Sequence, residues 1–291
     1  MENMKGIVLG ISIIACVTSV NAQELEAYRL YDGEGKEVDF GKMSLTLSKS
    51  DVILFGELHN DPIGHWLQLE LAKSLIESNK LVLGAEWFES DDQVIINEFL
   101  NGSATQDHLK KEAKVWPNYD TDYRPIIEFA KDNSIEFIAT NIPRRYASLV
   151  SKKGQGALDS LSKESKLLLP KMPYTVTEDD EGYESMKAMM GHGHGAGMNI
   201  DNMIAAQALK DYTMAENILL NRGKDELFIH YNGSFHSQNF DGISRYLKAK
   251  EPKLKVAVIA AVSDDSLDWN DEWKGMGTYI LVVPEGMTKT H

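Results

Sequence analysis

Short runs of hydrophobic residues with many β-branched side chains recur along the chain, separated by longer segments of mixed polarity. Runs of this length and composition are typical of strands that are buried on both faces of a parallel sheet. We therefore predict strands at residues 52–55, 81–85, 135–138, 227–231, 256–262 and 279–283.

Helical patterns separate most of these runs. Asp61 followed by Pro62 is a strong start signal, because an acidic N-cap accepts backbone N–H groups and proline suits the first helical position. Hydrophobic residues then recur every four positions as far as Leu75. Further helices are expected from Pro125 onwards and over residues 202–220. The alternation of strands and helices predicts an α/β fold with a mainly parallel or mixed central sheet flanked by helices.

Two middle segments, residues 93–123 and 144–199, contain no clear strand pattern. We expect them to form helices and loops that make a helical subdomain or lid over one end of the sheet. The second segment includes an acidic loop at 177–181 and a Gly/His-rich tract at 191–197. We expect a single domain over residues 23–291, because this length is ample for a substantial core.

Residues 1–22 have the features of a cleaved secretory signal peptide. Lys5 precedes a short apolar run, and Val20 and Ala22 supply the small residues expected before a signal-peptidase cut. The region also fits a lipoprotein cleavage box in which Cys16, the only cysteine, would carry the lipid. We therefore expect an exported protein, either periplasmic or anchored to a membrane as a lipoprotein, and held together without a disulfide.

The charge balance argues against one class of partner. The chain has 30 Lys and Arg residues against 44 Asp and Glu residues, which gives a formal net charge of −14. Binding to nucleic acid depends on clustered basic side chains that neutralise phosphates. We therefore expect no nucleic acid partner, although a local basic pocket is compatible with this total.

Acidic and histidine side chains follow several of the predicted strands directly. Glu57 and His59 come after the first of these strands, Glu86 after the second and His236 soon after the fourth. Ligands of parallel α/β sheets bind beyond the carboxyl ends of the strands, where these side chains would converge. Because buried acids are costly unless they are paired or used, we interpret the four residues as a functional site, catalytic if the protein is a hydrolase.

Structural roles are the alternative for some of these side chains. Glu57 would then form a salt bridge with Arg144 or Arg145. Gln207 and Asp211, one helical turn apart, would form a solvated pair on a helix surface.

The motif at 56–61, together with His65 and Gln68, resembles the opening motif of the ChaN-like haem-binding (iron-regulated) lipoprotein family. That family is distantly related to the erythromycin esterases and the TraB/Tiki proteins. Further matches follow in the family's order and extend the resemblance over residues 45–285. They lie at 84–88, 119–125, 129–130, 141–144, 206–215 and 233–236.

The resemblance implies haem bound in a cleft, with tyrosine as the axial ligand and two haems stacked across a homodimer interface. A phenolate is an anionic ligand that suits ferric haem. Tyr123 is the first candidate for the ligand and Tyr119 is the second. Further candidate haem-binding residues are His59, His65, Arg144 and Arg145, the arginines as partners of the propionates.

His192 and His194 lie in the Gly/His-rich tract and are candidate ligands for a metal ion or for haem iron, because His-rich tracts often bind metals. Incidental metal binding by the tract is the alternative.

Two functions are consistent with these patterns. The first is an exported haem-binding protein that serves iron or haem acquisition, with outer-membrane transport components as partners. The second is a metal-dependent hydrolase in which Glu57 or Glu86 is the base and His59 or His236 activates water or holds a divalent ion. Residues 233–236 lack a Gly-x-Ser-x-Gly pattern, which argues against a serine hydrolase. We favour haem binding because the overall resemblance is closest to that family.

Overall fold

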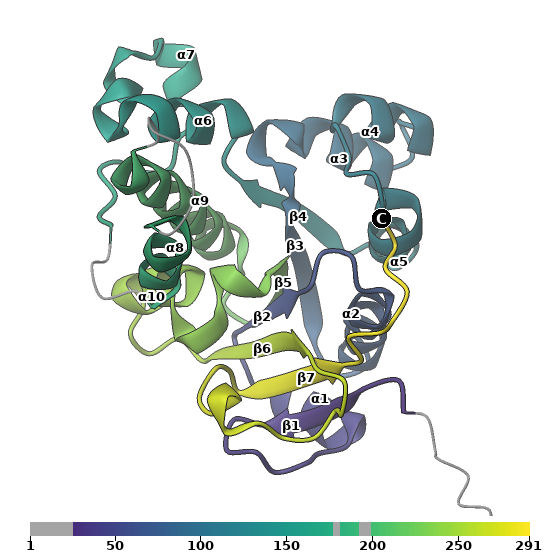
Figure 1. Ribbon diagram of the computed structural model, residues 1–291. Coiled ribbons are helices and arrows are strands. Elements are labelled where there is room, and N and C mark those ends of the chain that lie inside the picture. Colours follow the sequence, from purple (N-terminus) through teal and green to yellow (C-terminus); the bar gives the residue numbers. More distant parts are fainter. Residues whose placement is uncertain (1–25, 177–180, 192–198) are drawn as a thin grey trace, which may run out of the picture.

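A seven-stranded sheet forms the centre of the computed structural model, which describes residues 26–176, 181–191 and 199–291. The strand order is β1-β7-β6-β2-β5-β3-β4 (Figure 1). The pair β1 and β7 is antiparallel, and every other neighbouring pair is parallel. The strands are β1 (Arg29–Asp32), β2 (Val52–Glu57), β3 (Lys80–Glu89), β4 (Glu136–Asn141), β5 (Glu226–Gly233), β6 (Val256–Ser263) and β7 (Tyr279–Val283).

Every strand that the hydrophobic runs predict is present, and the α/β fold class is confirmed. The runs do not predict β1. This strand has four residues, of which only the middle two are buried, and it lies at the edge of the sheet. An edge strand of this kind needs no continuous hydrophobic run, so its sequence carries little signal.

Helices cover both faces of the sheet, and each face has its own hydrophobic cluster (Figure 1). Ile53 and Phe55 of β2 belong to one cluster, whereas Val52 and Leu54 belong to the other, because successive side chains of a strand point to opposite faces. The first face is covered by α1 (Phe40–Leu47), α2 (Pro62–Leu75), α3 (Gln93–Leu100), α4 (Gln106–Glu112) and α5 (Arg124–Asp132). The second face is covered by α6 (Arg144–Lys153), α8 (Glu181–Gly191), α9 (Ile200–Asn221) and α10 (Ile243–Lys250). The short helix α7 (Lys163–Lys166) contributes no buried residue.

The predicted helix starts agree with the structure. Asp61 is the N-cap of α2, and its carboxylate accepts the backbone N–H groups of Ile63 and Gly64. The middle segments consist of helices, turns and loops where the structure describes them, without a strand in those parts. No helix in the described ranges is both long enough and apolar enough to cross a bilayer. The short 3-10 helices are η1 (Ser90–Asp92), η3 (Gln155–Ser160), η4 (Ser234–His236), η5 (Gln238–Phe240) and η6 (Asp271–Trp273), and η2 (Tyr119–Tyr123) is a π-helical turn.

Candidate functional site

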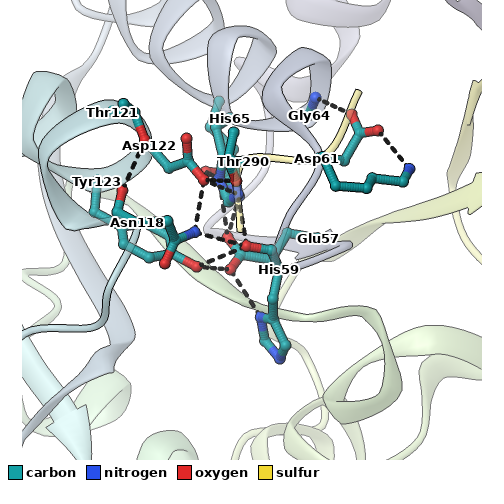
Figure 2. Close-up of polar contacts among 12 residues, drawn as sticks. Glu57, His59, Asp61, Gly64, His65, Asn118, Thr121, Asp122, Tyr123 and Thr290 are labelled. Atoms are coloured by element: carbon teal, nitrogen blue, oxygen red, sulfur yellow. Dashed lines mark hydrogen bonds and ion pairs between the residues drawn. The ribbon is translucent and has the colours of Figure 1, made fainter. Parts of the chain in front are cut away.

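The carboxylate of Glu57, at the end of β2, accepts hydrogen bonds from side chains of several elements (Figure 2). One oxygen lies 3.0 Å from His59 Nδ1, 3.0 Å from the Tyr123 hydroxyl and 3.2 Å from Trp87 Nε1. The other oxygen accepts the side-chain amide of Gln68 at 2.7 Å. Glu57 is only 2% exposed, so these donors replace the water that an ionised carboxylate would otherwise need.

Burial and pairing act in opposite directions on Glu57. Burial raises the pKa of a carboxyl group, but the nearby imidazole of His65 and the hydrogen bond from His59 outweigh it and leave the pKa of Glu57 below its usual value. His65 Nδ1 lies 3.6 Å from the carboxylate. Glu57 is therefore an anion at neutral pH.

His59 presents one ring nitrogen to Glu57 and the other to a cavity. Its Nδ1 faces the carboxylate, and Figure 2 shows the rest of the ring turned away from the other labelled groups. Burial lowers the pKa of His59, but Glu57 more than compensates and the pKa is raised. The side chain is 44% exposed, and Nε2 makes no hydrogen bond within the described part of the chain. Glu57 accepts a hydrogen bond from the Nδ1–H group of His59. In the neutral form of His59 the lone pair is therefore on Nε2.

The open side of His59 borders a cavity of about 620 Å³, here called the His59 cavity. Its lining combines polar groups with apolar strand-end residues. It consists of Glu57, Leu58, His59, Asn60, Gly233, Ser234, Phe235, His236, Gln238, Ala261, Val262, Ser263 and His291.

The backbone carbonyl of His59 is held as firmly as its ring. It accepts the side-chain amide of Asn118 at 2.8 Å, and His65 Nε2 lies 3.2 Å from it. The hydroxyl of Tyr123 lies 3.3 Å from the same oxygen. Asn118 also donates to Asp122 at 2.6 Å, and Asp122 is 3% exposed. The turn η2 and helix α2 thus fix the loop that carries His59.

A second acid–histidine pair lies on the other face of the sheet. His236 Nε2 lies 3.1 Å from Glu86, and its Nδ1 lies 2.5 Å from Asp211 of α9. Tyr183 of α8 donates its hydroxyl to Asp211 at 2.7 Å. Burial alone would lower the pKa of His236, but the two carboxylates outweigh it and raise the pKa to about 10. His236 is therefore an imidazolium at neutral pH, with both ring nitrogens engaged.

This shift predicts how stability depends on pH. Between pH 6.5 and about 10 the folded chain keeps the His236 proton and the unfolded chain has lost it. Folding is then linked to proton binding, so this group alone lowers the free energy of unfolding by about 1.4 kcal/mol per pH unit as the pH rises through the window. Urea unfolding at several pH values from roughly 7 to 9.5, inside this window, measures the slope of the unfolding free energy against pH. His236→Asn should flatten it, and an equally steep slope in that variant would contradict the assignment.

The two pairs meet at Gly233. Its N–H donates to Glu86 at 2.9 Å, and a Cβ placed on it would lie 2.8 Å from His59 Cε1. Glu57 faces α2 whereas Glu86 faces α9, so the carboxylates point to opposite sides of the sheet. The structure therefore brings Glu57, His59, Glu86 and His236 to one edge as two adjacent pairs.

A second cavity, of about 410 Å³, has four basic side chains in its lining, together with Glu86 and Glu89. Arg144, Arg145, Lys114 and Lys210 line it, as does Trp116. We call it the Arg144 cavity. The edge of the Trp116 ring contacts His59, with the ring centroids 5.0 Å apart.

The two arginines have acidic partners other than Glu57. Arg145 binds Asp91 at 2.6 Å, and Arg144 lies 3.8 Å from Glu89 with 76% of its side chain exposed. The alternative of a salt bridge from Glu57 to Arg144 or Arg145 is therefore wrong. Arg144 has the accessibility that an anionic ligand requires.

Both candidate tyrosines are buried. The hydroxyl of Tyr123 donates to Glu57, and burial together with that carboxylate holds its pKa well above the usual value. The hydroxyl of Tyr119 accepts the side-chain amide of Gln106 at 2.5 Å, and burial raises its pKa to about 12. Neither residue lines the His59 cavity or the Arg144 cavity. In this conformation neither phenol is placed to ligate a metal, and tyrosine ligation stays a prediction.

Other predicted residues lie elsewhere. His65 is 4% exposed and serves the hydrogen-bond network around His59. His192 and His194 lie outside the described residues. Within residues 26–176, 181–191 and 199–291, no three His, Cys, Asp or Glu side chains are grouped to hold a metal ion.

The sequence patterns missed some of the residues that hold this site. Asp211 is not half of a solvated pair, because it is 1% exposed and binds His236. Asn118 and Asp122 carried no recognisable signal. Thr290 was missed because it contacts Asp122 across a separation of 168 residues.

Comparison with known proteins places the chain in a family. The sequence profile described as "Haem-binding uptake, Tiki superfamily, ChaN" matches residues 43–247, more than half of the chain. The chain belongs to this family. The resemblance seen in the motifs from Gly56 onwards is thereby confirmed.

Among solved structures, ChaN of Campylobacter jejuni, reported with cofacial haem binding, has a similar fold. The TM-score is 0.64 at 16% identity, over 90% of this chain and 98% of that chain. An erythromycin esterase mutant in its open conformation gives a TM-score of only 0.46 at 12% identity, over 82% of this chain and 77% of that one. The chloroplastic protein RETICULATA-RELATED 5 of Arabidopsis thaliana is 27% identical over 165 residues. That match spans 52% of this chain and 22% of the plant protein.

Proposed function

We propose that this chain is an exported haem-binding protein, periplasmic or lipid-anchored, that serves iron or haem acquisition. The observation that carries the proposal is the state of His59. Its Nδ1 is held by a buried carboxylate, while its Nε2 is unpaired within the described chain and borders a cavity of about 620 Å³. Metal-ligating histidines typically have this arrangement, because the outer carboxylate fixes the tautomer and raises the basicity of the ligand.

The residues around His59 fit haem in other respects. Gly233 has no side chain and so leaves room for the His59 ring itself, because a Cβ there would lie 2.8 Å from His59 Cε1. Trp116 offers an aromatic surface next to His59, and Arg144 an exposed guanidinium for a propionate. We therefore propose His59 as the iron ligand in preference to Tyr123. Haem supplies the ferric iron, and the chain supplies the imidazole and the cations.

The assembly state is also part of the proposal. The Campylobacter relative is reported to bind haem cofacially. A homodimer of this chain that stacks two haems at the open side of the His59 cavity would be the equivalent arrangement. Outer-membrane transport components are the proposed partners in haem transfer.

Haemin titration tests the proposed function. A protein of residues 23–291, which lacks the predicted signal peptide, should bind haemin with a shift of the Soret band and a defined stoichiometry. The spectrum should be that of histidine-ligated iron. A titration in which haemin absorbance changes only as it does with an unrelated acidic protein would contradict haem binding.

Hydrolysis is the second candidate function, and the same observation on His59 favours it. An imidazole with Nδ1 on a carboxylate and Nε2 open to a cavity is placed to act as a general base toward water. A screen of esters and peptides would detect turnover, which His59→Gln should abolish. Turnover by the parent that survives this substitution would exclude His59 as the base.

A further inference from the structure

The segment that follows β7 returns to the candidate site. In Figure 1 it runs past α2 towards α5, far from the strand that precedes it. Lys289 Nζ lies 3.3 Å from Asp61, the N-cap of α2. Thr290 donates its backbone N–H to the carbonyl of Asn60 at 3.1 Å. The segment is therefore attached to the loop that carries His59.

A side-chain contact extends this attachment to the carbonyl of His59. The Thr290 hydroxyl donates to Asp122 at 2.6 Å (Figure 2). Asp122 accepts the amide of Asn118, which also donates to the His59 carbonyl at 2.8 Å. Because Asp122 is almost fully buried, loss of the Thr290 hydroxyl would leave a buried carboxylate with fewer donors.

The next residue, His291, lines the His59 cavity. Three imidazoles therefore border this cavity, those of His59, His236 and His291. Both nitrogens of His236 are engaged by carboxylates. His291 is exposed and makes no hydrogen bond to the part of the chain that the structure describes. His59 and His291 are thus the two imidazoles available to a group bound between them.

We propose that Lys289, Thr290 and His291 belong to the ligand site. Lys289 and Thr290 are positioning residues that hold the His59 loop, and His291 supplies a second imidazole to the bound group. The role of His291 rests on the proposed function, because the iron of a haem can take imidazole as an axial ligand. The positioning role does not rest on it.

Haemin binding tests the role of His291. His291→Ala should weaken haemin affinity by about tenfold, which is the smallest loss expected when a group that supports a metal site is removed. It should also change those bands of the haemin spectrum that depend on the iron ligands. His108→Ala is the matched control, since His108 is exposed in α4, and should leave both unchanged. Parental affinity and spectrum in His291→Ala would overturn this role. If the parent does not bind haemin at all, the proposed function and the role of His291 fall together.

Chemical labelling tests the positioning role without haem. Diethyl pyrocarbonate acylates neutral imidazole, and peptide mass spectrometry measures its rate at His59. Thr290→Val removes the hydroxyl while keeping the shape, and should raise that rate several-fold because the loop loosens. Thr290→Ser keeps the hydroxyl and should restore the parental rate. Equal rates in the parent and Thr290→Val would overturn the positioning role, even where haemin binding is intact.

Discussion

Replacement of His59 by alanine is expected to lower haemin affinity by about a hundredfold or more, because removal of a supporting group alone costs 10- to 100-fold in metal sites. The substitution removes the imidazole that Glu57 orients toward the His59 cavity. Spectrophotometric titration with haemin, together with the rate of haemin loss to a scavenger protein, measures the effect. The fold should persist, because Glu57 keeps its hydrogen bonds from Tyr123, Trp87 and Gln68.

Two other variants make this result specific. His108→Ala should bind haemin as the parent does, because His108 lies in α4, away from both cavities. Tyr123→Phe tests the tyrosine ligation that the family resemblance implies. If Tyr123→Phe abolishes the ligated spectrum while His59→Ala preserves it, the iron ligand is Tyr123 and our assignment of His59 is wrong.

Replacement of Glu57 by glutamine is expected to lower the free energy of unfolding by about 1–3 kcal/mol, the cost of leaving a buried hydrogen-bond donor without an acceptor. The oxygens of Glu57 receive donors from His59, Tyr123, Trp87 and Gln68. A glutamine has one oxygen and one NH2 group, so at least one donor would face another donor in a buried space. Urea denaturation at about pH 7, where the carboxylate of Glu57 is ionised in the parent, measures the loss of unfolding free energy.

The matched control for Glu57→Gln is Glu70→Gln. Glu70 forms an exposed ion pair with Lys73 on the surface of α2, and such pairs contribute about 0–1 kcal/mol. Unfolding of this variant should therefore stay close to that of the parent. A Glu57→Gln protein that unfolds at the parental urea concentration would mean that the carboxylate does not organise the buried network.

The sequence predicted the parts of the fold that depend on burial. Continuous hydrophobic runs identified every strand except β1, and the Asp61-Pro62 pair identified the start of α2. Residues such as Glu57 and Glu86 were found because they follow those runs. Their opposite orientation was not foreseen, because strands buried on both faces show no alternation between polar and apolar side chains.

Long-range contacts account for the remaining omissions. Asp211 lies on α9, a helix with buried residues around much of its surface, so no polar stripe marked its role. The contacts of Thr290 depend on where the chain goes after β7, which local patterns do not encode. The burial of Tyr123 depends on its packing against Trp87, with ring centroids 4.1 Å apart, and on the hydrogen bond to Glu57.

The orientation of the two acid–histidine pairs has a mechanical consequence. Glu57 and His59 are held by the layer that contains α2, whereas Glu86 and His236 are held by the layer that contains α9. A ligand that touches both pairs would cross-link the two layers through the rim of the sheet. A bound ligand should then slow proteolysis of helices in both layers and raise the unfolding temperature.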